Sequence, residues 1–340
     1  MIKKFFFPAL LTISIISLTI SLCSSRPNGY DFIRNKDSLD IILDRYVDEG
    51  LDPVIYARLE NLDGDVLYEH SAVNRNLLPL VDINGQTWFR IWSMSKIITI
   101  TIAMDLVEDG ILGLNDPVTK YIPEFENLKV AVSKNGKVLS EIKIDDPALS
   151  ISKAMTEEAC PFKLVSTDSL MTVLHLLNHE AGFYYAKTNI YCLDSLLATK
   201  NLPTAKNSQE LIDLLAEMPL IQHPGTKHFY GTNTTVLGLV AERATGKSLK
   251  QLVEERLTKP LGINGLQYGL PPHTTLLPTF SAKDTILRTA KPEELDIFGP
   301  DVPDYDLNHE LYFGGEGMLA TADGYADFLR MLLNRGTLNG

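Results

Sequence analysis

The chain has 340 residues, of which 45% are hydrophobic and 22% are charged, and its formal net charge is -12. This composition is typical of a globular protein with enough apolar material for a core, and the length permits one large domain or a domain with a sizeable insertion. The negative charge argues against a nucleic-acid backbone or an anionic membrane surface as a partner, because like charges repel.

An uncharged apolar segment follows the first four residues. Residues 5–22 carry no charge and come directly after Lys3 and Lys4. A basic region followed by an apolar one is typical of an export signal, so we interpret residues 1–22 in this way. The apolar run is also close to the minimum length of a membrane-spanning helix, and an uncleaved anchor is the alternative. Both interpretations predict an exported protein of the periplasm or cell envelope.

The chain contains three cysteines. Cys23 ends the apolar run, and its surroundings resemble the cleavage site of bacterial lipoproteins, except that Leu22 stands where a small residue is usual. The resemblance implies a lipid on Cys23 that would tether the protein to a membrane. Cys160 and Cys192 either pair in the oxidising compartment or remain buried thiols, and the sequence leaves both alternatives open.

Hydrophobic spacing predicts a mixed α and β chain after a polar linker at 23–36. The predicted elements are a helix at 37–49, two strands joined by a turn at 61–64, a hairpin near 134–136, helices at 94–109, 167–178, 208–218 and 234–256, and a helix in the last 20 residues. Residues 259–312 are rich in Pro and Gly and show little periodicity. Because no βαβ pattern repeats, the fold class is α/β of the α+β type.

Three S-x-x-K matches occur, at 93–96, 140–143 and 150–153. Only Ser93 and Lys96 lead into a long apolar segment, whose alternation permits a strand but whose length and terminal Gly110 favour a buried helix. Residues three apart share a helix face, so the Lys96 amine reaches the Ser93 hydroxyl. Burial disfavours the charged lysine, and the helix N-terminus stabilises a developing oxyanion. A surface Ser and Lys is the alternative.

A second segment, PGTKHFYGTNTTVLGLVAERATG at 224–246, begins with a turn and continues into an apolar helix. Tyr230 precedes that helix, on the loop side. A tyrosine beside a lysine cation loses its proton more easily and serves as a base. A core tyrosine is the alternative interpretation.

Four segments occur in the order FRIWSMSKIITITIAMDLVEDGILGLNDPVTKYIPEF, MTVLHLLNHEAGF, PGTKHFYGTNTTVLGLVAERATG and GGEGMLATADGYADFLRMLL. Together they resemble the serine β-lactamase-related family, which contains class C β-lactamases, D-alanyl-D-alanine carboxypeptidases, D-aminopeptidases and β-lactamase-like esterases. The resemblance covers about residues 38 to 336. It implies an antiparallel sheet flanked by helices, with a mainly helical region inserted between sheet segments, in a domain at 37–340. It also implies no metal and no organic cofactor.

The resemblance assigns three catalytic residues by position. Ser93 matches the nucleophile, Lys96 the lysine of S-x-x-K, and Tyr230 the tyrosine of the second motif. The implied chemistry is acyl transfer, in which Tyr230 takes the proton of Ser93 and Ser93 attacks an ester or amide carbonyl. The backbone N–H of Ser93 is the expected oxyanion donor.

The sequence departs from the family pattern in two places. The β-lactamases have Tyr-x-Asn as second motif, whereas Thr232 stands at that position here and Asn233 follows it. In this second motif, and in the segment FRIWSMSK at 89–96, the sequence resembles the esterase-like members of the family. The third motif, a Lys- or His-x-Gly on a strand, does not occur after residue 312. We therefore expect that the chain is a fragment that lacks the C-terminal strands of the sheet.

Two other features receive a structural interpretation. His175 and His179 have a spacing of four that also occurs in zinc sites, but no third ligand accompanies them, so we interpret them as structural histidines. The glycine-rich FGGEGML lacks the spacing and the lysine of a phosphate loop. The resemblance places it beside the active-site cleft, where Gly314 and Gly315 permit close backbone packing.

The sequence thus predicts an exported serine hydrolase that cleaves a small-molecule ester or amide through an acyl-enzyme on Ser93, with a carboxylesterase favoured. A β-lactamase or peptidoglycan D-peptidase is the alternative. A non-catalytic envelope protein that keeps the fold for binding is the second alternative, although binding alone does not require Ser93, Lys96 and Tyr230.

Overall fold

The computed structural model describes residues 36–141, 162–185, 191–282, 284–291, 294 and 310–338. The described chain begins with helix α2 (Lys36–Asp48) and the antiparallel hairpin of β1 (Val54–Glu60) and β2 (Val66–Val73). The side-chain oxygen of Asn61 closes the hairpin turn by accepting the backbone N–H groups of Asp63 and Asp65, at 3.0 and 2.8 Å. The predicted helix and both predicted strands are confirmed.

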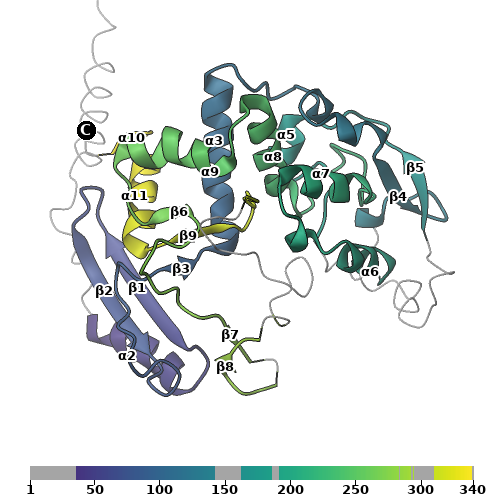
Figure 1. Cartoon of the computed structure of the whole chain (residues 1–340). Helices are drawn as coiled ribbons and strands as arrows, with labels where there is room; N and C mark the ends of the chain where they lie inside the picture. Colours follow the sequence, from purple (N-terminus) through teal and green to yellow (C-terminus); the bar gives the residue numbers. More distant parts are fainter. Residues whose placement is uncertain are drawn as a thin grey trace, which may run out of the picture.

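A second, three-stranded sheet joins distant parts of the chain. Strand β9 (Met318–Ala320) lies between β3 (Phe89–Arg90) and β6 (Leu266–Tyr268), antiparallel to both, and Leu319 faces Arg90 on one side and Gln267 on the other. The chain between β3 and β6 is mainly helical (Figure 1). This arrangement confirms antiparallel sheet segments with an inserted helical region.

Helix α3 (Ser95–Glu108) lies at the centre of the molecule, between the sheets and the inserted region (Figure 1). Ile98, Thr99, Ile102, Ala103 and Leu106 are buried along it. Their burial explains why this apolar segment is a helix rather than the strand that its alternation permits, since a central helix packs its apolar side chains against several neighbours. The predicted helix at 94–109 is confirmed.

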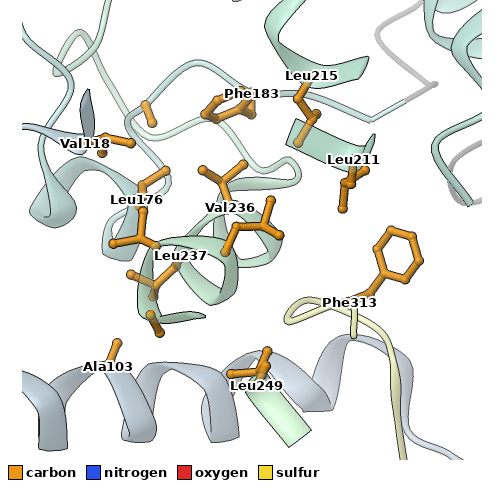
Figure 2. Packing of buried hydrophobic residues seen from close by; sticks show 14 of the residues in the cluster. Ala103, Val118, Leu176, Phe183, Leu211, Leu215, Val236, Leu237, Leu249 and Phe313 are labelled. Atoms are coloured by element: carbon orange, nitrogen blue, oxygen red, sulfur yellow. The ribbon is translucent and has the colours of Figure 1, made fainter. Parts of the chain in front are cut away.

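The inserted region packs against α3 through α8 (Asn233–Thr245) and α9 (Leu249–Val253). Figure 2 shows how Ala103 of α3, Val236 and Leu237 of α8, and Leu249 of α9 lie in one apolar cluster with side chains of the surrounding segments. The predicted helix at 234–256 is therefore two helices. Gly246 ends α8 with a φ of 69°, a left-handed conformation that glycine adopts without strain.

The rest of the inserted region differs from the sequence prediction in detail. Helix α5 (Val173–Leu177) is shorter than predicted because Thr172 caps its start and accepts the N–H of His175. A turn forms at 134–136, but β4 (Lys129–Ser133) pairs with β5 (Phe162–Ser166) and meets the far side of the turn only at the bridge between Val132 and Val138. Helix α7 (Ser208–Ala216) matches its prediction, whereas α6 (Tyr191–Lys200) was not predicted.

The last third of the described chain returns to the sheets. A π-helical turn (Glu254–Thr258) and α10 (Lys259–Leu261) lead to β6, and the short strands β7 (Phe280–Ser281) and β8 (Arg288–Thr289) follow. The chain ends in the predicted amphipathic helix, α11 (Ala322–Leu333), which lies beside the first hairpin in Figure 1. Within the described residues, every helix is too short or too polar to cross a membrane.

Candidate active site

A sharp strand-to-helix turn presents Ser93 to solvent. Strand β3 ends at Arg90, a 3₁₀ turn spans Trp92–Met94, and α3 begins at Ser95. Trp92 has a φ of 43°, in the left-handed region where a non-glycine residue is strained. This conformation turns the chain so that Ser93 is exposed at the N-terminal end of α3, where unpaired N–H groups make the electrostatic potential positive.

The structure brings together the three side chains that the sequence predicts to be catalytic. The Tyr230 hydroxyl lies 2.8 Å from Ser93 Oγ, and Lys96 Nζ donates to the same Oγ at 3.1 Å. Nζ also lies 5.0 Å from the centroid of the Tyr230 ring. Ser93 and Lys96 come from the start of α3 and Tyr230 from the loop before α8, so the packing of these helices creates the contact.

Lys96 is almost completely buried, with 6% of its surface exposed. Besides Ser93 Oγ, its Nζ donates to the backbone carbonyl of Gly315 at 3.0 Å and to Oε1 of Glu316 at 3.1 Å. A buried ammonium requires such partners, because burial of an unpaired charge is costly. This carboxylate counteracts the burial of Lys96, which alone would disfavour the charged form.

Glu316 is the functional candidate that sequence reasoning missed. Its side chain is fully buried, and its carboxylate accepts from Lys96, from the Tyr185 hydroxyl and, at 3.0 Å, from Thr235 Oγ1. Burial and the neighbouring Glu316 anion raise the pKa of Tyr185 well above its usual range, so Tyr185 remains a hydrogen-bond donor. The available signal was an acidic residue inside an otherwise uncharged segment, FGGEGML.

The glycine-rich segment lies against α3, beside the site, as the resemblance implies. Thr99 Oγ1 donates to the Gly314 carbonyl at 2.7 Å, and Ser95 Oγ accepts the N–H of Met318 at 3.2 Å. A Cβ on Gly315 would lie 2.9 Å from Thr235 Oγ1 and 3.3 Å from Lys96 Nζ. Glycine is required because the backbone itself packs against the lysine.

His179 supports the ring of Tyr230. It lies beyond the end of α5, the helix that contains His175. Its ring stacks on Tyr230 with centroids 5.0 Å apart and planes 18° apart. Burial, the Lys96 cation and His228 lower the pKa of His179 to about 4, which keeps the imidazole neutral near pH 7.

The amide of Asn233 contacts His179. It is fully buried at the start of α8, and its Nδ2 lies 3.2 Å from Nδ1 of His179 and 3.4 Å from the carbonyl of Phe229. Thr232 is also buried. Both residues that follow in the second motif are thus buried, and the amide of Asn233 contacts His179 and Phe229.

The remaining sequence candidates lie elsewhere. Ser140 lies in a short turn (Leu139–Glu141), and its backbone carbonyl accepts a hydrogen bond from Lys227. Lys143 and the match at 150–153 lie outside the described residues. Cys23 and Cys160 also lie outside them, so their chemistry stays a prediction. Among the described side chains, no group of three His, Cys, Asp or Glu residues is arranged to hold a metal ion.

Comparison with known proteins agrees with this geometry. The family model named Beta-lactamase matches residues 61–340. The chain belongs to the Beta-lactamase family. An uncharacterized protein of Mycobacterium tuberculosis is 28% identical over 264 residues, which are 76% of this chain and 57% of that protein. The lovastatin esterase of Penicillium rubens is 29% identical over 252 residues, which are 72% of this chain and 55% of the esterase.

A solved structure shares the fold. The structure described as "EstCE1, a hydrolase with promiscuous acyltransferase activity" superimposes with a TM-score of 0.65 and 21% identity, over 89% of this chain and 73% of that chain. The present chain spans little more than half the length of the curated relatives named above. Family membership thus rests on the match to the family model, and the solved structure shows that the fold is shared.

Proposed function

We propose that the chain is a serine hydrolase that forms an acyl-enzyme on Ser93, with carboxylic esters as its substrates. The observation that carries the proposal is the pair of hydrogen bonds on an exposed serine, 2.8 Å from Tyr230 and 3.1 Å from Lys96. A nucleophile within hydrogen-bonding reach of a base, with a second group that orients both, is the arrangement that activates a hydroxyl.

In the proposed reaction, Tyr230 in its phenolate form accepts the Ser93 proton while Oγ forms a bond to the substrate carbonyl carbon. The N–H of Ser93 and the N-terminus of α3 stabilise the oxyanion that develops. The tetrahedral intermediate then breaks its bond to the alcohol, which leaves with the proton from Tyr230. In the second half of the reaction, Tyr230 takes a proton from water while the water oxygen attacks the acyl carbon. The bond to Ser93 Oγ then breaks, Tyr230 returns the proton to Oγ, and the acid is released.

The orientation of Asn233 supports an ester rather than a β-lactam as substrate. A site that binds an amide uses a polar side chain to hold it, and here the amide of Asn233 is buried against His179. The relatives named above as an esterase and as a hydrolase with acyltransferase activity support the same class. Acyl transfer to an alcohol is the second candidate, because an acyl-enzyme reacts with either acceptor.

The test uses the purified chain and a fluorophosphonate probe that labels active serines. Mapping the adduct to Ser93, with no labelling of Ser93→Ala, is the expected result. A folded chain that remains unlabelled would overturn the proposal. Initial rates on a p-nitrophenyl ester and on a chromogenic cephalosporin then separate esterase from β-lactamase, and addition of a primary alcohol reveals acyl transfer as an ester product.

We also propose that the protein is exported and held at the cell envelope through Cys23. The support is the sequence of residues 1–23, because these residues lie outside the described part of the structure. Expression in a bacterial host with radiolabelled palmitate tests this proposal. Label in the membrane fraction that disappears in Cys23→Ala supports it, and an unlabelled cytoplasmic product contradicts it.

A further inference from the structure

The further inference concerns the proton of Ser93 and rests on the proposed function. Two groups next to Ser93 are candidate bases, the Tyr230 phenol and the Lys96 amine, and both lie within hydrogen-bonding distance of Oγ. The surroundings of each group decide which of them accepts the proton.

Lys96 has three acceptors around its nitrogen: Ser93 Oγ, the carbonyl oxygen of Gly315 and Oε1 of Glu316, all at 3.0 to 3.1 Å. An ammonium has three N–H donors and no acceptor, so it satisfies all three contacts at once. A neutral amine has two N–H donors and a lone pair, so it would donate to Gly315 and Glu316 and accept from the Ser93 hydroxyl. The three distances fit either form, and the carboxylate charge 3.1 Å from Nζ favours the ammonium.

Glu316 supplies the charge that this arrangement requires. It is fully buried, and the hydroxyls of Tyr185 and Thr235 hydrogen-bond to its two oxygens. A carboxylate that accepts several hydrogen bonds is held in its ionised form, and a buried ion pair remains charged only when such partners are present. The pair of Lys96 and Glu316 is therefore a fixed, net-neutral unit behind the nucleophile.

We propose that Glu316 is a positioning residue of the reaction: its buried carboxylate holds Lys96 as an ammonium that donates to Ser93, so that the Ser93 proton passes to Tyr230. In this state the Ser93 hydroxyl accepts a hydrogen bond from the Lys96 ammonium and donates one to the Tyr230 phenolate. Glu316 does not touch the reacting atoms and acts through Lys96.

The pKa values of the neighbouring groups allow this assignment to be tested through the pH dependence of activity. Tyr185, which donates to Glu316, and Tyr268, which interacts electrostatically with it, have pKa values raised above their usual range, mainly by burial. On the other side, His179 has a pKa of about 4, and His228 lies against it with ring centroids 5.7 Å apart. His179 therefore does not titrate in the alkaline range, where the effect of Glu316 on activity is measured.

The experiment compares the wild-type chain with Glu316→Gln and with the control Thr235→Val. Thr235→Val removes a hydrogen bond to the carboxylate but preserves the charge. Rates of p-nitrophenyl ester hydrolysis and of fluorophosphonate labelling at Ser93 are measured from about pH 5 to about pH 10. In Glu316→Gln we expect kcat to fall about 10- to 100-fold with KM nearly constant, and the alkaline limb to move down by about 1 pH unit or more. In Thr235→Val we expect a loss below about tenfold and an unmoved limb.

Two results would overturn the inference while leaving the proposed function intact: an unmoved limb in Glu316→Gln, or an equal shift in both variants. A wild-type chain without label on Ser93 overturns the function and the inference together. If Glu316→Gln does not fold, the double variant Lys96→Met/Glu316→Gln provides the test by thermal unfolding. We expect the double variant to recover stability relative to either single variant, because it leaves no unpaired charge. No recovery contradicts the ion pair.

Discussion

Lys96 separates two environments that contain similar groups. On the outer side, the exposed Ser93 and the half-exposed Tyr230 meet solvent. On the inner side, Tyr185 and the fully buried Glu316 form a closed network. Each side has a tyrosine ring near the ammonium, with centroids at 5.0 Å for Tyr230 and 5.5 Å for Tyr185. The two tyrosines lie at similar distances from the lysine, so their hydrogen-bond partners and their burial decide their roles. Tyr230 contacts the nucleophile, whereas Tyr185 donates to Glu316.

Removal of the nucleophile is expected to have the largest effect on the outer side. Ser93→Ala should lower kcat/KM for a p-nitrophenyl ester by at least about 10⁴-fold, because no other hydroxyl occupies that position. The matched control is Ser140→Ala, which alters the serine of a second S-x-x-K match in a turn of the inserted region. The control should retain wild-type rates, and a comparable loss in both variants would contradict the assignment of Ser93.

The two tyrosines provide the direct comparison of the two sides. Tyr230→Phe removes the proposed base and should lower kcat about 10²- to 10⁴-fold. Tyr185→Phe removes one neutral donor to Glu316 and should cost less than about tenfold. Steady-state kinetics on the same ester measures both variants. Equal losses would mean that the buried phenol participates in the proton transfer.

Acid should weaken the packing beneath Tyr230. The pKa of His179 is lowered from 6.5 to about 4 in the folded chain, so the unfolded chain binds a proton in this range and the folded chain does not. Stability is therefore fully present above about pH 6.5 and falls as the pH decreases towards 4, by about 3 kcal/mol. Urea unfolding between these pH values measures the change. His179→Gln should reduce this slope, and an unchanged slope would show that other groups cause it.

The smallest expected effect tests the close approach on the inner side. Gly315→Ala places a methyl group 2.9 Å from Thr235 Oγ1 and 3.3 Å from Lys96 Nζ, so these groups must shift. We expect a destabilisation of about 1 kcal/mol and a loss of about three- to tenfold in kcat. Gly336→Ala is the control for stability, since nothing lies within 4 Å of its added methyl group, although its φ of 93° adds strain. A faster Gly315→Ala enzyme would show that Lys96 needs no close backbone contact.

Local patterns predicted the elements that depend mainly on their own sequence. The hairpin of β1 and β2 follows from its turn residues, and α11 follows from its amphipathic spacing. The apolar segment after Ser93 was harder, because its alternation is compatible with a strand, and its length settled the assignment correctly. The helix predicted at 234–256 was too long because Gly246, which ends α8, lies inside an apolar pattern that continues beyond it.

These local patterns did not predict which distant strands pair with one another. Strand β9 joins β3 and β6 with only three residues, too few for a periodic signal. Similarly, β4 pairs with β5 rather than across its own turn, since the burial of both faces depends on neighbours from elsewhere in the chain. Short strands of this kind are defined by tertiary contacts rather than by propensity.

The sequence by itself determined which hydroxyl, amine and phenol to consider, because spacing along a helix and a resemblance in order along the chain are one-dimensional properties. Only the tertiary structure decided what surrounds them. Glu316, Tyr185 and Thr235 come from separate segments and meet at Lys96 because α3, α8 and the glycine-rich segment pack together. Charge pairing and burial depend on distances through space, so the inner side of the site became visible only in the folded chain.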